Sequence, residues 1–157
     1  MKEVISAIQD KITEEVTDLK YVDKDWGQLD YDQPPVKYPF CLIDITDMDY
    51  SNLAHGTQIG TGQVVITVGV MHLTASSSQA PDKENSYKAV ELLKKINDVV
   101  QTWSNGEFSN LIRTRTKKLY KSKGLDIYCA FYSTQWKETI PSTTTALNPE
   151  GIKISVD

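Results

Sequence analysis

The chain has 157 residues, of which 39% are hydrophobic and 24% are charged, as is typical of one globular domain. Its formal net charge of −4 disfavours a general nucleic-acid binder. No apolar run approaches the roughly 20 residues that span a bilayer, which disfavours a membrane protein. The charge is divided unevenly: residues 1–57 carry twelve acidic and five basic side chains, a net of −7, whereas residues 111–123 carry six basic side chains and no acid.

The first predicted element is an amphipathic helix over residues 2–20. Apolar side chains recur there at spacings of three or four residues, which places them on one helical face. They are Ile5, Ile8, Ile12, Val16 and Leu19. Residues 23–37 lose this periodicity and are rich in Asp, Gly, Gln and Pro, so an irregular connector is predicted. Because Pro34 and Pro35 favour extended geometry, we expect the end of the connector to be a stiff spacer that projects from the domain.

Two strands are predicted next, over residues 38–46 and 61–74, because both stretches are rich in β-branched or aromatic residues. The stretch DMDYSN, which follows the first strand, is predicted to form a turn. Pro39 has no amide donor and is therefore expected at the start or the edge of a strand.

A second amphipathic helix is predicted to begin near Pro81 or Asp82 and to end at residues 104–106, SNG. Its apolar positions are Tyr87, Val90, Leu93, Ile96, Val100 and Trp103. The basic run that follows favours a strand, and Gly124 favours a turn before a last strand over residues 125–136. Alternation in that strand places four side chains on one face: Leu125, Ile127, Cys129 and Phe131. It places four others on the opposite face: Asp126, Tyr128, Ala130 and Tyr132.

This order of elements predicts one α+β domain over residues 1–139, with a mainly antiparallel sheet of about four strands and two helices packed on one face. Residues 140–157 are predicted to be a linker and a C-terminal arm, with a strand at residues 152–156. That strand has two open placements, the sheet edge of a neighbouring molecule or the sheet of its own chain. Cys41 and Cys129 lie in apolar runs and are interpreted as core thiols.

Neither acidic nor glycine-rich motifs indicate a site. Asp44, Asp47 and Asp49 offer oxygen ligands, but they lack the spacing, the glycine and the terminal glutamate of a calcium-binding loop. The glycines of IGTGQ, residues 59–63, precede a strand rather than a helix. We therefore interpret them as a turn or bulge and not as a phosphate-binding loop.

Histidine and aromatic residues also have ordinary interpretations. His55 lies in a polar loop and His72 at the end of an apolar strand, with no nucleophile or acid near them in the sequence. Tyr128, Tyr132 and Trp136 are interpreted as packing of the sheet against helices rather than as a ligand site. We expect no enzymatic activity, no cofactor, and no catalytic or metal-binding residue.

The alternation RTRTKK predicts a strand that presents Arg113, Arg115 and Lys117 on one face, with Lys118 after them. Three roles are open for it: a solvated edge strand protected from aggregation by its charge, a docking face for an acidic partner, or a nucleic-acid stripe. The predicted interface residues on the acidic side are Asp23, Asp25, Asp30 and Asp32, together with Pro34 and Pro35. Separate acidic and basic regions are the unlike patches that a head-to-tail contact between copies uses.

The order of the elements also carries a family resemblance. An amphipathic helix leads to an acidic connector, PPVKYPFCLIDI, a β-rich strand, a Ser-rich loop, a second helix that ends in Trp, and GLDIYCAFYSTQW. Over residues 1–138 this order resembles the small tail-terminator or tail-completion proteins of long-tailed bacteriophages and related prophage proteins.

The resemblance implies an α+β structural protein that assembles into a ring, hexameric in that family, which caps the tail tube and joins it to the neck. It implies self-association, partners in the tail tube and neck, and a place in the bacterial cytoplasm during assembly and then in the virion tail. Two other classes stay open: a small ligand-binding or enzymatic α+β domain, and a protein-interaction module that forms no ring.

Overall fold

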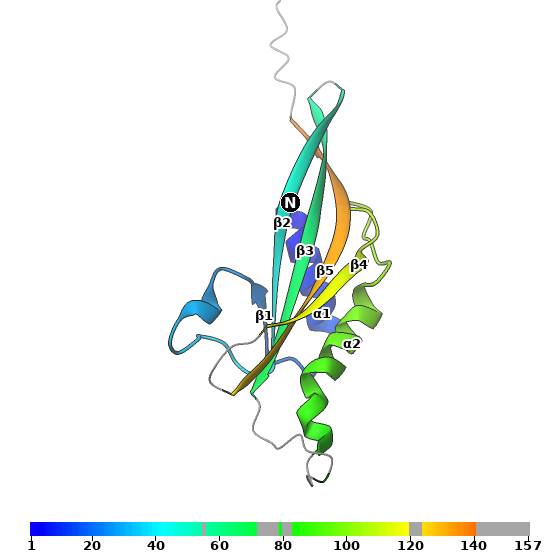
Figure 1. Cartoon of the computed structure of the whole chain (residues 1–157). Helices are drawn as coiled ribbons and strands as arrows, with labels where there is room; N and C mark the ends of the chain where they lie inside the picture. The colour runs from blue at the N-terminus through cyan, green and yellow to red at the C-terminus, as the bar shows by residue number, and fades with distance from the viewer. Residues whose placement is uncertain (55, 72–78, 80–82, 120–123, 141–157) are drawn as a thin grey trace, which may run out of the picture.

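The structure is a computed structural model that describes residues 1–54, 56–71, 79, 83–119 and 124–140 (Figure 1). In chain order the elements are α1 (Lys2–Glu15), β1 (Tyr21–Lys24), the 3-10 helix η1 (Gln28–Asp30), β2 (Phe40–Ala54), β3 (Thr57–Met71), the 3-10 helix η2 (Lys83–Tyr87), α2 (Lys88–Val100), β4 (Ile112–Leu119) and β5 (Leu125–Thr139). Several predictions fall outside the described residues: those for His55 and His72, the helix start at Pro81 or Asp82, and the strand at residues 152–156.

The strands form one five-stranded sheet in the order β1-β2-β3-β5-β4. β1 runs parallel to β2, and all other neighbouring pairs are antiparallel. The α+β class and the mainly antiparallel sheet are confirmed, but the described sheet has five strands instead of about four and contains one parallel pair. The additional strand, β1, has the sequence YVDK, which is too short and too polar to show a strand period. Its pairing with the start of β2 supplies the backbone partners that make it a strand.

Both helices pack on one face of the sheet and form the main core with alternate residues of β2, β3 and β5. The buried side chains of the helices are Val4, Ile5, Ile8 and Ile12 from α1, and Ala89, Leu92, Leu93, Ile96 and Val100 from α2. In β5, Ala130 and Tyr132 belong to this core, as does Trp136. The predicted packing of the aromatic stripe against the helices is therefore confirmed.

Both helices end before the predicted residues. α1 ends at Glu15, because Val16 leaves helical geometry with φ −115° and ψ 72°, although its side chain is still buried. α2 ends at Val100, and Trp103 packs from the following loop against Phe108, with ring centroids 5.3 Å apart. Two predicted apolar positions of the second helix, Tyr87 and Val90, are exposed.

β2 and β3 form a long hairpin that extends past the helices (Figure 1). The predicted turn at DMDYSN is wrong, because these residues continue β2 through a bulge at which Asp47 has φ 51°. The chain turns instead at residues 54–57, where Gly56 has φ 76°. We call the end of the sheet that includes this hairpin turn the tongue; it comprises residues 47–54, 56–62 and 134–140.

Gly60 and Gly62 lie within β3, so no turn forms at IGTGQ. The ladder does have a bulge opposite Gly62, but its additional residue belongs to β2. A Cβ atom on Gly60 would stand 2.6 Å from Cε2 of Trp136, and one on Gly62 would stand 2.8 Å from Cη2 of the same indole. Trp136 therefore lies directly over both glycines. On the other face of the sheet, a Cβ atom on Gly69 would stand 2.3 Å from Cζ of Phe40. These glycines provide the space in which the two aromatic rings pack.

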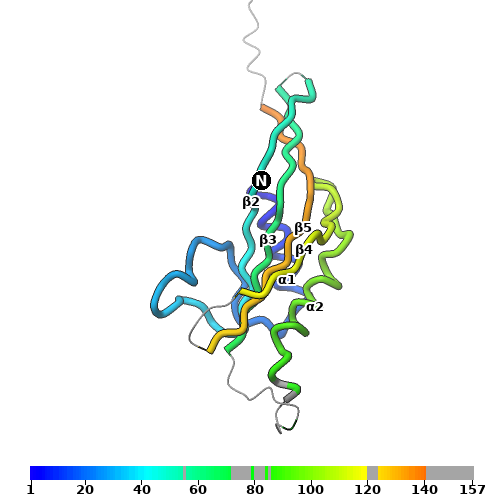
Figure 2. The backbone as a smooth tube through the Cα atoms, in the orientation of Figure 1, coloured from blue at the N-terminus to red at the C-terminus, as the bar shows by residue number. Residues whose placement is uncertain are grey.

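The chain between β1 and β2 packs over one end of the face opposite the helices. We call residues 25–38 the lobe; Figure 2 shows its path out from the sheet and back. Phe40, Leu42 and Ile127 form a second, smaller buried cluster, against which Leu29 and Val36 of the lobe pack. The predicted projection of the connector is thus limited by these apolar anchors.

Cys41 and Cys129 are both buried and free, which confirms their interpretation as core thiols. Cys41 belongs to the helix-side core. Burial raises the pKa of its thiol, and burial also raises the pKa of the nearby Tyr132 hydroxyl to about 12. Tyr132 is fully buried and lies 3.2 Å from Oδ1 of Asn97, to which it donates a hydrogen bond. Both groups are held in their protonated forms by the fold.

We therefore expect stability to fall at alkaline pH. Both folded-state pKa values are raised, so the stability is fully present below the ordinary thiol pKa near 8.5 and is lost as the pH rises toward 12. Tyr132 alone should account for about 1.4 kcal/mol of that loss by pH 11. Urea unfolding measured between pH 8 and pH 11 checks this expectation, with the Cys41→Ala/Tyr132→Phe double variant as the comparison. If the double variant loses stability as steeply as the parent, these two groups are not the cause.

Candidate interaction surfaces

The basic strand β4 forms one edge of the sheet. Its residues are exposed along the whole strand apart from half-buried Leu119, as expected for an edge element. It pairs with β5 on one side, and no other described strand pairs with it on the outer side. The prediction that the basic run is a strand is confirmed.

A bulge divides the basic side chains of β4 between the two faces of the sheet. The register shifts so that Arg113 lies opposite Tyr132, whereas Arg115 lies opposite Phe131. Tyr132 and Phe131 are consecutive in β5 and point to opposite faces. The prediction of a single face is therefore wrong for Arg113, which lies on the helix side. Thr114 is the additional residue, and its hydroxyl donates a hydrogen bond to the Phe131 carbonyl oxygen at 3.1 Å.

The four basic side chains of β4 also differ in their partners. Lys118 forms an ion pair of 2.7 Å with buried Asp126, and the hydrogen bond to this carboxylate raises the pKa of Lys118 against the opposing effect of partial burial. Arg115 places its guanidinium carbon 4.2 Å from the centroid of the Phe131 ring. In the described part of the chain, ion pairs of β4 are limited to Lys118.

The opposite edge of the sheet is formed by β1, and the acidic lobe follows it. Asp23 accepts hydrogen bonds from the Tyr21 hydroxyl at 2.7 Å, from Nε1 of Trp26 at 3.3 Å and from Nε2 of Gln28 at 3.4 Å. Partial burial opposes ionisation, but these hydrogen bonds outweigh it and keep the pKa of Asp23 below its ordinary value. Asp23 thus organises its own chain, and its place in an interface stays a prediction.

Gln28 fixes the start of the lobe from a fully buried position. Its Oε1 accepts a hydrogen bond from the Trp26 amide at 2.8 Å, and its Nε2 donates to the Lys24 carbonyl oxygen at 2.7 Å. Asp25 accepts a hydrogen bond from the Gly27 amide at 3.0 Å. The exposed acidic residues of the lobe are Asp30 and Asp32, and of the two prolines Pro35 is exposed and Pro34 half-buried.

Sheet order keeps the predicted acidic and basic residues apart within one molecule. β1 and β4 are the two outer strands, so the acidic lobe and the basic strand lie at opposite edges (Figure 1). The sequence separates these residues in the chain, but only the strand order shows that they occupy opposite edges of one sheet.

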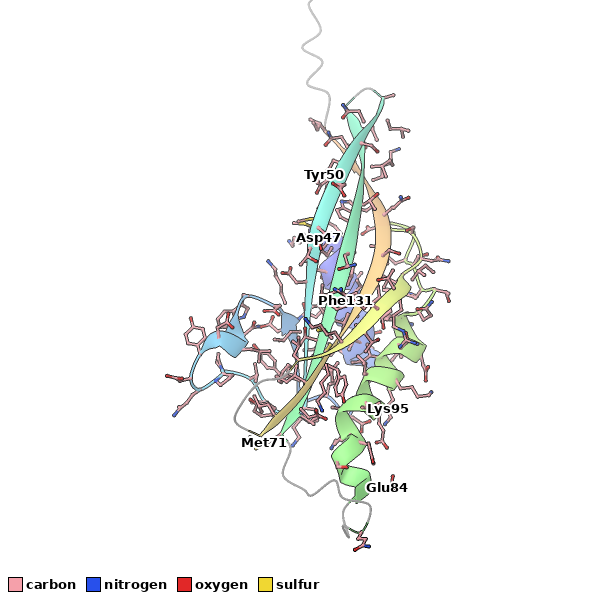
Figure 3. The ribbon with its side chains drawn as sticks, in the orientation of Figure 1. Asp47, Tyr50, Met71, Glu84, Lys95 and Phe131 are labelled. Carbon is pink, nitrogen blue, oxygen red and sulfur yellow. The ribbon has the colours of Figure 1, made fainter. Side chains whose placement is uncertain are left out.

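Between the lobe and the tongue, the face opposite the helices carries no described helix; we call it the open face. Figure 3 labels Phe131 at the middle of this face. The pairing of β2, β3, β5 and β4 aligns Asp44, Val65, Phe131 and Arg115 in one row across the sheet. Sequence reasoning missed this row, because the alignment depends on the registers of three strand pairs.

The tongue exposes several large apolar side chains. Met48, Tyr50, Leu53 and Ile140 are all exposed, the last two by 62% and 66%. Tyr50 lies edge-on to Trp136, with ring centroids 6.1 Å apart, and Figure 3 shows it on the part of β2 that leads to the tip. The hydrogen bond from the Ile140 amide to the Gly56 carbonyl oxygen, at 2.9 Å, holds the end of β5 against the hairpin turn.

A depression of about 480 Å³ lies beside the N-terminus and is lined by residues of α1, β5 and the loop before β4. Its polar groups interact with one another: the terminal amine lies 3.4 Å from carboxylate oxygens of both Glu3 and Glu138, and Trp136 donates to Glu138 at 2.8 Å. Among the described residues, no cluster of His, Cys, Asp and Glu is arranged to hold a metal ion. No described helix is long and apolar enough to cross a membrane.

No protein-family model and no curated protein matches the sequence. Among solved structures, 28 chains match, one of them from the "Virion of native gene transfer agent (GTA) particle". That chain is 12% identical and superposes with a TM-score of 0.45 over 83% of this chain and 84% of the other. At this level the likeness assigns neither a family nor a function.

Proposed function

We propose that this protein is a structural, non-enzymatic component of a phage-type virion, a tail terminator whose copies assemble head to tail into a ring. The ring caps the tail tube and joins it to the neck, with six copies as in the family that the sequence resembles. The observation that carries the proposal is the position of the acidic lobe and the basic strand β4 at opposite edges of one sheet.

A head-to-tail contact joins two unlike patches, and repeating it by rotation closes a ring. In this protein the exposed Asp30 and Asp32 of one copy would meet Arg113 of the next. The complementary charges set the order and orientation of the copies more than they set the affinity. A contact through the two edges of the sheet also leaves both helices packed, because α1 and α2 cover one face and not the edges.

The tongue provides a second surface for the proposed partners. Exposed Leu53 and Ile140 lie near the hairpin turn at its end. Figure 1 shows this end of the hairpin beyond the helices and away from the lobe. Clustered apolar side chains at a projecting end are typical of protein contacts. A tail tube or neck protein that binds this end would leave both sheet edges available for ring formation.

Paired charge reversals test the ring. We expect Arg113→Glu and the double variant Asp30→Lys/Asp32→Lys each to weaken association about tenfold or more, because each brings like charges together. Mixed in equal amounts, the two variants should again form rings, in alternating order. Sedimentation velocity and electron microscopy of particles, alone and with purified tail tubes, measure the outcome.

Lys88→Glu is the matched control, because it makes the same charge change at an exposed position of α2, away from both edges. Assembly of this variant should equal that of the parent. A parent that stays monomeric even on tail tubes, or variants that assemble as the parent does, would contradict the ring.

A further inference from the structure

The row of Asp44, Val65, Phe131 and Arg115 places opposite charges on either side of an apolar centre. Directly paired residues of neighbouring strands share a face, so all four side chains point away from the helices. Burial agrees with this direction, because Ile66, Ala130 and their alternate neighbours belong to the helix-side core, whereas Val65 and Phe131 do not.

Asp44 and Arg115 cannot neutralise each other within one chain. Three strand spacings separate them, roughly 14 Å. Neither residue forms an ion pair with any other described residue. The guanidinium of Arg115 lies over the ring of Phe131, which keeps its charge on the open face. This row therefore offers one acidic and one basic group to an external partner.

We propose that the open face binds the open face of a second copy, about a twofold axis parallel to the strands and through the middle of this row. Such an axis reverses the order of the row in the partner. Asp44 then meets the partner's Arg115, Arg115 meets the partner's Asp44, and Val65 meets the partner's Phe131. The contact is self-complementary, as a twofold interface must be.

The charges select this axis over the alternative. A twofold axis across the strands would place Asp44 against the same residue of the partner and Arg115 against its own counterpart, and like charges in contact are unfavourable. An axis along the strands also keeps the two sheets aligned, the arrangement in which sheets commonly pack face to face about 10 Å apart.

The neighbouring rows suit an interface as well. Lys117 lies on the same face as Arg115, one row away, and adds a positive charge near the partner's Asp44. On the other side of the row, Thr46, Gln63 and Ser133 provide hydroxyl and amide groups. An apolar centre with a polar rim is the usual composition of a protein–protein contact.

This pairing goes beyond the proposed ring and uses different residues. The ring contact joins the lobe to β4 edge to edge and is tested at Arg113 on the helix side. The pairing joins open faces and is tested at Asp44 and Arg115. Failure of one contact leaves the other intact. The two contacts also differ in the mass of the assembly that each produces by itself: the open-face pairing gives two copies and the ring gives six.

The test measures dimer formation of the full chain by sedimentation equilibrium and native mass spectrometry. Asp44→Arg and Arg115→Asp should each raise the dimer Kd about tenfold or more, because each creates two like-charge contacts. Mixing the two variants should restore dimers that contain one copy of each, since both contacts are then between opposite charges. Circular dichroism and thermal melts establish that each variant is folded.

Lys88→Asp is the control: it makes the same change of charge at an exposed position of α2, on the helix side of the sheet, so dimerisation should be unchanged. Three results would overturn the proposal. They are a parent that does not dimerise up to its solubility limit, single variants that dimerise as the parent does, and a mixture in which no mixed dimer forms.

Discussion

Replacing Gly60 by valine should destabilise the protein by about 3 kcal/mol and lower its melting temperature by roughly 6–12 °C. The first added carbon would stand 2.6 Å from Cε2 of Trp136, inside van der Waals contact. The indole cannot move away easily, because Trp136 is only 4% exposed and belongs to the main core. Chemical denaturation and calorimetry of the variant measure the loss.

A double-mutant cycle tests whether this loss comes from the clash with the Trp136 indole. Trp136→Ala alone should cost about 3–5 kcal/mol, and Gly60→Val in that background should cost much less than in the parent. Thr61→Val is the control in the same strand, because Thr61 is half-buried on the opposite face. Its hydroxyl accepts an exposed hydrogen bond from Nε2 of Gln135 at 3.2 Å, so the change should cost less than about 1 kcal/mol. If the losses in unfolding free energy of the two single variants add fully in the double variant, Gly60 does not provide the space for the indole.

Local patterns in the sequence predict the helices and the apolar strand segments, but not where strands end. Asp, Ser and Asn in DMDYSN have low strand propensity, so this stretch favours a turn when it is considered alone. In the fold, β3 pairs with it as far as Ala54 and satisfies its backbone groups. Gly60 and Gly62 are misleading for a related reason: their partner is Trp136, which follows more than 70 residues later in the chain.

The same limit applies to the candidate surfaces. The basic run is predicted as a strand because its charges alternate, and the structure agrees. Strict alternation, however, assigns Arg113 and Arg115 to one face, and the bulge at Thr114 separates them. The sequence correctly predicts to which face of the sheet each side chain of residues 125–132 points, because β5 has no bulge in its pairing with β3 there. Whether Arg115 and Asp44 share a row depends on three pairings, and no local pattern encodes those.

Phe40→Ala should cost about 3–5 kcal/mol and should also release the lobe. Phe40 is fully buried, packs directly over Gly69 and lies beside Tyr38, with ring centroids 5.6 Å apart. It is the largest member of the small cluster against which Leu29 and Val36 pack. Without it the lobe loses its apolar anchor, so trypsin should cleave after exposed Lys37 faster than in the parent.

Trp26→Ala is the control within the same lobe. Trp26 is 52% exposed and contacts Tyr31 edge-on, so its removal should cost less than about 1 kcal/mol and leave the cleavage rate near that of the parent. If the Phe40→Ala variant is cleaved as slowly as the parent, the Phe40 side chain does not anchor the lobe.

Because the lobe carries Asp30 and Asp32, a released lobe should also weaken head-to-tail assembly. If Phe40→Ala releases the lobe and rings still form as in the parent, the acidic side of the contact must lie elsewhere.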